Sequence, residues 1–171
     1  MAKKDLLVIE MNNKEDMECF NFREKLKIAQ KPYDYFKEIE NLNFDQLASS
    51  DRIFLQDFGI YNNELNDEEF MLRLRFPAGR ISNNSLILIS NLAQKYNLQI
   101  ILTARAGIQL HGLDSNNILE VFNQINSQNI SSYQSFGDNV RNITSDICDG
   151  IGIYNIIKVF PYIEQMQTDI L

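Results

Sequence analysis

A strictly alternating segment, residues 70–76, restricts the possible folds of this chain more than any other feature. Its sequence, FMLRLRF, places large apolar side chains on one face of an extended strand and Met71, Arg73 and Arg75 on the other. Other elements have to cover the apolar face, because exposing it to water is unfavourable. The pattern therefore predicts a half-buried strand whose arginine-bearing face lies at a surface.

The chain after this strand alternates between helical and extended patterns. The sequence PAGR breaks the strand, and apolar residues then recur at helical spacing over 81–97 and again over 113–129. Extended patterns cover 98–105 and 108–112, and a weaker one covers 130–136. The resulting order is β-α-β-β-α-β, which predicts an α+β domain with the ferredoxin-like arrangement.

The ends and buried faces of both helices can be predicted. Ser82 is expected to cap the first helix, and Asp114 or Ser115 the second. The buried residues expected in the first helix are Leu86, Ile89, Ala93 and Tyr96. Those expected in the second helix are Ile118, Val121, Phe122 and Ile125. Outside this unit we expect a mostly helical N-terminal extension and a C-terminal helical segment that is interrupted, or starts afresh, at Pro161.

Two helices on one face of a four-stranded sheet leave the other face available for a ligand or a partner. Strand alternation assigns six residues to that face: Arg73, Arg75, Thr103, Arg105, Gln109 and His111. Because this arrangement serves many functions, its ligand has to be inferred from the side chains.

Charge is distributed unevenly along the chain. The net charge is −7, yet no Asp or Glu occurs from Phe70 to Gly112, where five Lys and Arg residues lie. A local cationic zone on an acidic protein indicates a bound anion, and the alternative is a solvated cationic surface. The overall acidity opposes binding to nucleic acid or to anionic membranes. Without a signal peptide, a membrane span or a cysteine cluster, the sequence predicts a cytoplasmic protein.

The sequence contains no nucleophile elbow and no phosphate-binding loop, and it predicts no metal site. Its chemistry-bearing residues are the arginines Arg73, Arg75, Arg105 and Arg141. Guanidinium groups bind carboxylates and oxyanions through paired hydrogen bonds and stay charged at neutral pH. These arginines are either a site for a multiply charged anion or a group of exposed cations. A single histidine such as His111 is more often structural than an acid–base group.

Three segments resemble successive signature segments of the nitrite/sulfite reductase family, whose members use sirohaem and an iron–sulfur cluster. They read FMLRLRFPAGRIS, LTARAGIQLHG and GDNVRNI, and each contains an arginine. The resemblance implies three parts in this chain: an N-terminal extension over 1–64, a ferredoxin-like half-domain over 65–136, and the start of the sirohaem-binding domain, truncated, over 137–171.

The resemblance also implies roles for individual residues. Arg73 and Arg141 would be catalytic, because they would lie beside the substrate oxyanion. The cofactor-binding residues would be Arg73, Thr103, Arg105, Gln109, His111, Arg141 and Asn142. Arg75 matches the motif but can equally be structural, and Arg80 has no clear role. Sirohaem carries several carboxylates and the substrate is an anion, so fixed positive charge suits both.

The family's cluster cysteines and its second half-domain would fall beyond residue 171. We therefore expect the N-terminal part of a sirohaem-dependent nitrite or sulfite reductase that is inactive alone and binds neither sirohaem nor the 4Fe–4S cluster by itself. Its expected partners are a small oxyanion and either a second half-domain or another copy of the chain in a homodimer, with no nucleic acid and no membrane. The alternative is a stand-alone anion- or tetrapyrrole-binding module without catalysis. RNA binding is disfavoured by the acidity of the chain.

Overall fold

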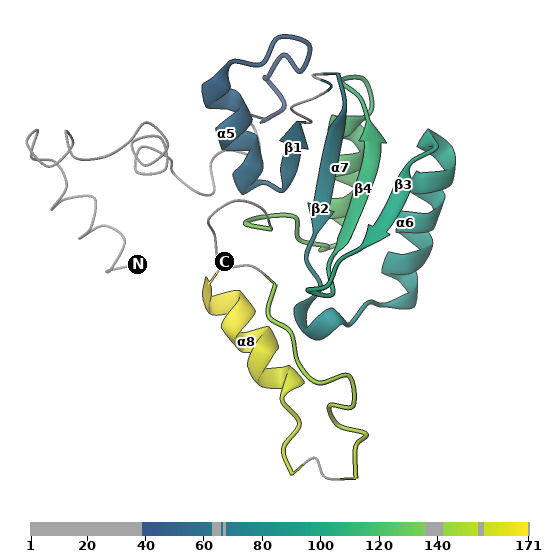
Figure 1. Ribbon diagram of the computed structural model, residues 1–171, viewed down its shortest axis with the longest axis vertical. Coiled ribbons are helices and arrows are strands. Elements are labelled where there is room, and N and C mark those ends of the chain that lie inside the picture. Colours follow the sequence, from purple (N-terminus) through teal and green to yellow (C-terminus); the bar gives the residue numbers. More distant parts are fainter. Residues whose placement is uncertain (1–38, 63–65, 67, 136–141, 154–155, 171) are drawn as a thin grey trace, which may run out of the picture.

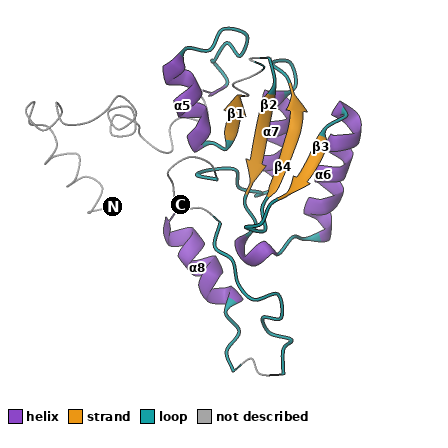
Figure 2. Ribbon diagram, in the orientation of Figure 1, coloured by secondary structure: helices purple, strands orange, loops and turns teal. Residues whose placement is uncertain are grey.

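The computed structural model describes residues 39–62, 66, 68–135, 142–153 and 156–170. Their centre is an antiparallel four-stranded sheet with two helices packed on one face (Figures 1 and 2). The strands, in sheet order, are β1 (Ile60–Asn62), β2 (Phe70–Leu74), β4 (Ile108–Leu113) and β3 (Gln99–Leu102). The helices on the sheet are α6 (Asn83–Tyr96) and α7 (Ile118–Ser127). The predicted α+β class and ferredoxin-like arrangement are confirmed.

The alternation in β2 divides its side chains between the two faces of the sheet. Phe70, Leu72 and Leu74 are at most 1% exposed and lie in the core, together with Leu110 of the neighbouring strand β4. Arg73, which points to the opposite face, is only partly buried. The period of the sequence therefore fixes which side chains of β2 face the helices.

Helix α6 starts where the sequence predicted. The Ser82 hydroxyl oxygen accepts a hydrogen bond from the backbone N–H of Ser85 at 3.0 Å. Ile89 and Ala93 are buried as expected, but Leu86 is 51% exposed, so its assignment to the core was wrong. Leu86 lies in the first turn of α6, Leu88 is partly buried against the core, and Ile89 is the first fully buried residue of this helix.

Helix α7 starts later than predicted. The Asp114 carboxylate accepts hydrogen bonds from the backbone N–H groups of Asn116 and Asn117, which closes a turn before the helix instead of capping it. The N-cap is Asn117, whose side chain makes no capping hydrogen bond. The buried face is the predicted one, and all four of its residues are at most 1% exposed: Ile118, Val121, Phe122 and Ile125.

The fourth strand of the sheet comes from the segment before β2 and not from residues 130–136. Strand β1 pairs antiparallel with β2, from Ile60 opposite Leu72 to Asn62 opposite Phe70. Residues 130–135 make one backbone–backbone hydrogen bond to the chain at the end of β2, from the Arg75 N–H to the Ser131 carbonyl, and then turn away at Tyr133 and Gln134. Gln134 has a φ of 50°, which is incompatible with an extended strand.

Strand β3 ends at Leu102, so Thr103 and Arg105 lie in a turn and not in the strand predicted over 98–105. The Thr103 carbonyl accepts from the Ala106 N–H, and its hydroxyl oxygen accepts from the Gly107 N–H at 3.0 Å. Ala106 has a φ of 54°, in the left-handed region that reverses the chain direction. Local hydrogen bonds of Thr103 thus override the strand pattern.

Two further helices flank the sheet. Helix α5 (Ser49–Asp57) precedes β1, within the stretch expected to be helical. Helix α8 (Phe160–Ile170) starts next to Pro161. This agrees with the prediction that the C-terminal helical segment starts afresh at this proline. The Asp149 carboxylate accepts the backbone N–H groups of Val159 and Phe160, and Arg80 pairs with it at 3.2 Å. The hydrogen bond from Val159, the one from Phe160 and the charge of Arg80 hold the pKa of Asp149 below its usual value.

Strand β3 is one of the two edge strands of the sheet, opposite β1. All its residues are exposed, and the apolar side chains of Ile100, Ile101 and Leu102 are 41%, 37% and 78% exposed. Natural edge strands usually carry charges that prevent further pairing, and β3 has none. None of the helices in the described part of the chain is long and apolar enough to cross a bilayer.

Candidate anion-binding site

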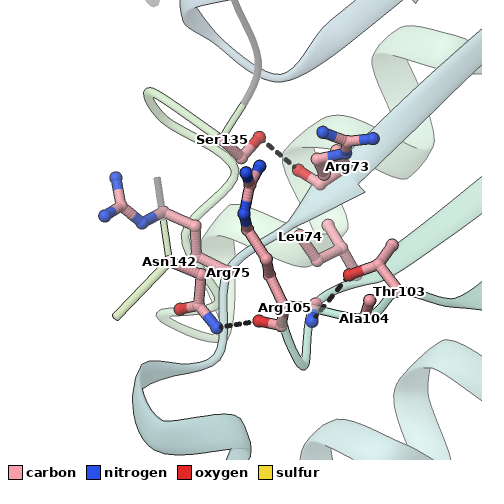
Figure 3. A pocket seen from close by; sticks show the side chains of 9 residues that line it. Arg73, Leu74, Arg75, Thr103, Ala104, Arg105, Ser135 and Asn142 are labelled. Carbon is pink, nitrogen blue, oxygen red and sulfur yellow. Dashed lines mark hydrogen bonds between the residues drawn. The ribbon is translucent and has the colours of Figure 1, made fainter. Parts of the chain in front are cut away.

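A cavity of about 280 Å³ opens where β2 ends and the 103–107 turn begins. Three segments that are distant in the sequence contribute to it (Figure 3). The residues that line it are Arg73, Leu74, Arg75, Thr103, Ala104, Arg105, Gly107, Ser135 and Asn142. Three of them are arginines and none of these nine residues is acidic. The cavity is therefore a cationic site with hydroxyl and amide groups beside the charges.

Arg73 is held in place through its backbone on both sides. Its N–H donates to the Gly59 carbonyl at 2.8 Å, and its carbonyl accepts from the Ser135 hydroxyl at 2.8 Å. A Cβ added at Gly59 would come within 2.7 Å of the Arg73 carbonyl oxygen and closer still to Ser132 and Ser135. Only glycine therefore permits this close approach of the chain to β2.

Arg105 is positioned by the turn and by Asn142. The Asn142 side-chain NH₂ donates to the carbonyls of Arg105 and Phe76, each at 2.8 Å. This amide joins the 103–107 turn to the end of β2, while its oxygen, Oδ1, is buried and has no hydrogen-bond partner among the described residues. The Arg105 side chain itself is exposed and can adapt to a ligand.

Arg75 is the buried cation of the site, with 2% of its surface exposed. It donates to the Gln167 side-chain oxygen of α8 at 3.1 Å and to the Tyr133 carbonyl at 3.4 Å. Burial lowers its pKa to about 10, because the charged form loses its hydration. An anion in the cavity would offset that loss.

The structure divides the predicted site residues into two groups. Arg73, Thr103, Arg105 and Asn142 line the cavity, whereas Gln109 and His111 do not. Gln109 lies opposite Arg73 on β4, and His111 follows it on the same face. Arg141 lies outside the described residues.

Arg80 lies outside the cavity and makes contacts that hold the fold together. Besides pairing with Asp149, its guanidinium lies 4.1 Å from the ring centre of Phe160. Arg80 therefore anchors the start of α8 to the half-domain.

Sequence reasoning missed Ser135 as a lining residue. The pattern around it favours a strand, and 62 positions separate it from Arg73. No spacing or motif indicates that the two meet. In the described part of the chain, no group of three or more His, Cys, Asp or Glu side chains could hold a metal ion.

Comparisons with known proteins agree with this geometry. Residues 63–128 match the family model of the nitrite/sulfite reductase ferredoxin-like half domain. The ferredoxin–nitrite reductase of Synechococcus elongatus is 29% identical over 159 residues, which cover 90% of this chain and 31% of that protein. The sulfite reductase [NADPH] hemoprotein beta-component of a Paenibacillus species is 32% identical over 97 residues, covering 53% of this chain and 17% of that protein.

A solved structure shows the same fold. The NirA protein of Mycobacterium tuberculosis superimposes with a TM-score of 0.76 at 20% identity, over 90% of this chain and 32% of NirA. The chain thus spans about a third of the length of the Synechococcus elongatus reductase and of NirA. The half-domain match over residues 63–128 and the similarity to these reductases support a place for the chain in the nitrite/sulfite reductase family.

Proposed function

We propose that this chain supplies part of the sirohaem- and substrate-binding site of a nitrite or sulfite reductase. The observation that carries the proposal is the cavity lined by Arg73, Arg75 and Arg105 with no carboxylate among its lining residues. Planar guanidinium groups bind carboxylates and small oxyanions with paired, charge-assisted hydrogen bonds. In this proposal Arg73 and Arg105 bind the anion, and Arg141 approaches the same ligand.

The donor set of the cavity fits the carboxylates of sirohaem, and its volume limits how much of that group it can take. At about 280 Å³ it lies at the lower end of small-molecule sites, which span roughly 300–1,000 Å³. It therefore suits a carboxylate arm or one small oxyanion, while the macrocycle would extend beyond it. When bound, sirohaem and its iron–sulfur cluster would supply the redox chemistry.

The residues of this chain would bind and orient the anion. Arg73 and Arg105 would neutralise its charge, and Arg75 would provide a buried positive potential beneath it. The Thr103 hydroxyl accepts from Gly107 and can still donate its own hydrogen to the anion. Asn142 Oδ1 would accept from a protonated oxygen or from a water molecule that delivers protons.

For the partner, we propose that a second half-domain or another copy of this chain covers the edge of β3. Exposed apolar side chains on an uncharged edge strand favour a protein contact. A twofold axis perpendicular to this edge strand would let two identical strands pair antiparallel.

Anion titration of the 171-residue chain tests the proposal. We expect nitrite and sulfite to shift backbone NMR signals around the cavity, and Arg105→Met to weaken nitrite binding about tenfold or more. Lys95→Met is the matched control, because it removes an exposed cation of α6 that pairs with Glu120 away from the cavity. Equal weakening in both variants would contradict the proposal.

The alternative function is an anion- or tetrapyrrole-binding module without catalysis. Reconstitution distinguishes the two functions: the chain is mixed with sirohaem, then with the remaining domains of a related reductase. Restored nitrite or sulfite reduction favours the reductase part, while sirohaem binding without turnover favours the module.

A further inference from the structure

Three polar side chains form a row on the open face of the sheet beside the cavity. Arg73 of β2 lies directly opposite Gln109 of β4, and His111 is the next residue of β4 on the same face. The Gln109 side-chain amide lies between the other two, with one end 3.0 Å from His111 Nε2 and the other against the Arg73 guanidinium. Gln109 and His111 are each partly buried.

Arginine can only donate hydrogen bonds, so it determines the orientation of this row. The Gln109 oxygen has to face Arg73, where it accepts from Nε at 2.9 Å and also from one NH₂ group. The Gln109 NH₂ then faces His111 Nε2 and donates to it at 3.0 Å. A nitrogen that accepts a hydrogen bond carries no proton, so His111 is neutral with its proton on Nδ1.

We propose that Gln109 is a positioning residue that fixes the Arg73 guanidinium at the cavity and makes its position depend on the protonation of His111. A proton on His111 Nε2 turns that nitrogen into a donor. The Gln109 amide then has to rotate, and its NH₂ faces the donors of Arg73. Arg73 then loses the acceptor that Gln109 provides, and its planar fork is no longer held in the direction that Gln109 fixes.

The charges near His111 do not by themselves explain why anion binding would weaken when His111 is protonated. Its pKa is lowered by burial and by the charge of Arg73, against the opposing charge of Glu69. Across the sheet, its neighbours on β2 and β3 are Met71 and Gln99, which carry no charge. If electrostatics alone acted, a protonated His111 would strengthen anion binding in the cavity. The relay through Gln109 predicts the opposite sign.

His111 is the single histidine of the chain, so its NMR signals need no assignment. In the 171-residue chain without ligand, we expect a neutral ring with Nδ1 protonated and Nε2 unprotonated. Gln109→Met, which keeps the length of the side chain, should raise the pKa of His111, because neutral Nε2 loses its donor. Gln99→Met, the matched control on β3, should leave the pKa unchanged. A neutral ring with the proton on Nε2, or an unchanged pKa in Gln109→Met, would overturn the proposal.

The effect of His111 protonation on anion binding rests on the proposed function. It is measured separately, as the affinity of the chain for nitrite. We expect wild-type affinity for nitrite to fall as the pH falls through the pKa of His111. Gln109→Met should bind nitrite about three- to tenfold more weakly at neutral pH and more tightly as the pH falls. The same pH dependence in both proteins would refute the relay. The expected NMR result in a chain that binds no nitrite would support the relay and refute the proposed function. If Gln109→Met does not fold, Gln109→Glu keeps the acceptor for Arg73 and should also raise the pKa of His111.

Discussion

Replacing Arg75 by methionine should separate the stability of the chain from its capacity to bind anions. Methionine keeps most of the apolar length of the arginine stem and removes the buried charge. In the folded chain this charge is almost fully out of water, at 2% exposure. We expect Arg75→Met to leave the folded chain as stable as the wild type or more stable, and to weaken its stabilisation by anions.

The magnitude follows from the burial of the guanidinium. Its pKa falls to about 10 on folding, and a shift of this size corresponds to about 3 kcal/mol of unfavourable free energy. Since the folded pKa is the lower one, this cost is fully present at neutral pH and disappears only as the pH rises from about 10 towards the ordinary pKa of arginine. Among the described residues, the variant loses the hydrogen bonds to Gln167 and Tyr133, together about 1–3 kcal/mol. The free energy of unfolding should therefore rise by about 0–2 kcal/mol.

Urea and thermal unfolding with and without nitrite or sulfate measure both effects. An anion at ten times its Kd stabilises a single site by about 1.4 kcal/mol, which raises the Tm of a domain of this size by about 3–6 °C. We expect this rise in the wild type and a clearly smaller one in Arg75→Met. The reasoning fails if the variant is destabilised by more than about 2 kcal/mol and still gains the full anion-dependent rise.

Three further predictions concern the fold, the partner and the cofactors. Ser82→Ala should lower the free energy of unfolding by about 1 kcal/mol, because α6 loses its cap, whereas Ser90→Ala on the exposed side of α6 should change it little; urea titration compares them. Leu102→Lys should shift a dimer to monomers in sedimentation, while Ile87→Lys, at an equally apolar exposed site on α6, should not; dimers that persist in Leu102→Lys would exclude pairing through β3. The chain purified alone should show no iron–sulfur absorbance and no turnover of nitrite or sulfite, since two cysteines cannot supply a four-cysteine cluster.

Local sequence patterns predicted most elements of the half-domain. The alternation of FMLRLRF determined which face of β2 enters the core, and the helical spacing determined the buried side of α7. The hydroxyl of Ser82 identified the start of α6. Such features depend only on residues a few positions apart, because the backbone periods of strand and helix repeat over that distance. The cationic zone over 70–112 likewise indicates an anion through the distribution of charge along the chain alone.

Errors arose where a local pattern competed with hydrogen bonds to other parts of the chain. Thr103 continues an apolar strand in sequence, yet its own hydroxyl closes a turn with Gly107 and ends β3. Residues 130–136 look extended, but β1 already occupies the place beside β2. Two short segments could pair with the edge of β2, and the one that covers more of the core is favoured. The alternation of a sequence does not show how much core a segment covers.

The sequence by itself thus determined strand β2, the two helices on the sheet, the buried face of α7 and the face of β2 that carries Arg73. Only the tertiary structure decided that Arg73, Arg105, Ser135 and Asn142 line one cavity, and that Gln109 and His111 stand beside it. The tertiary structure also decided that Arg75 is buried against Gln167 of α8, which lies 92 positions away. The physical reason is that a side chain's face follows from its own strand or helix, whereas a site forms between segments whose approach depends on the packing of the whole chain.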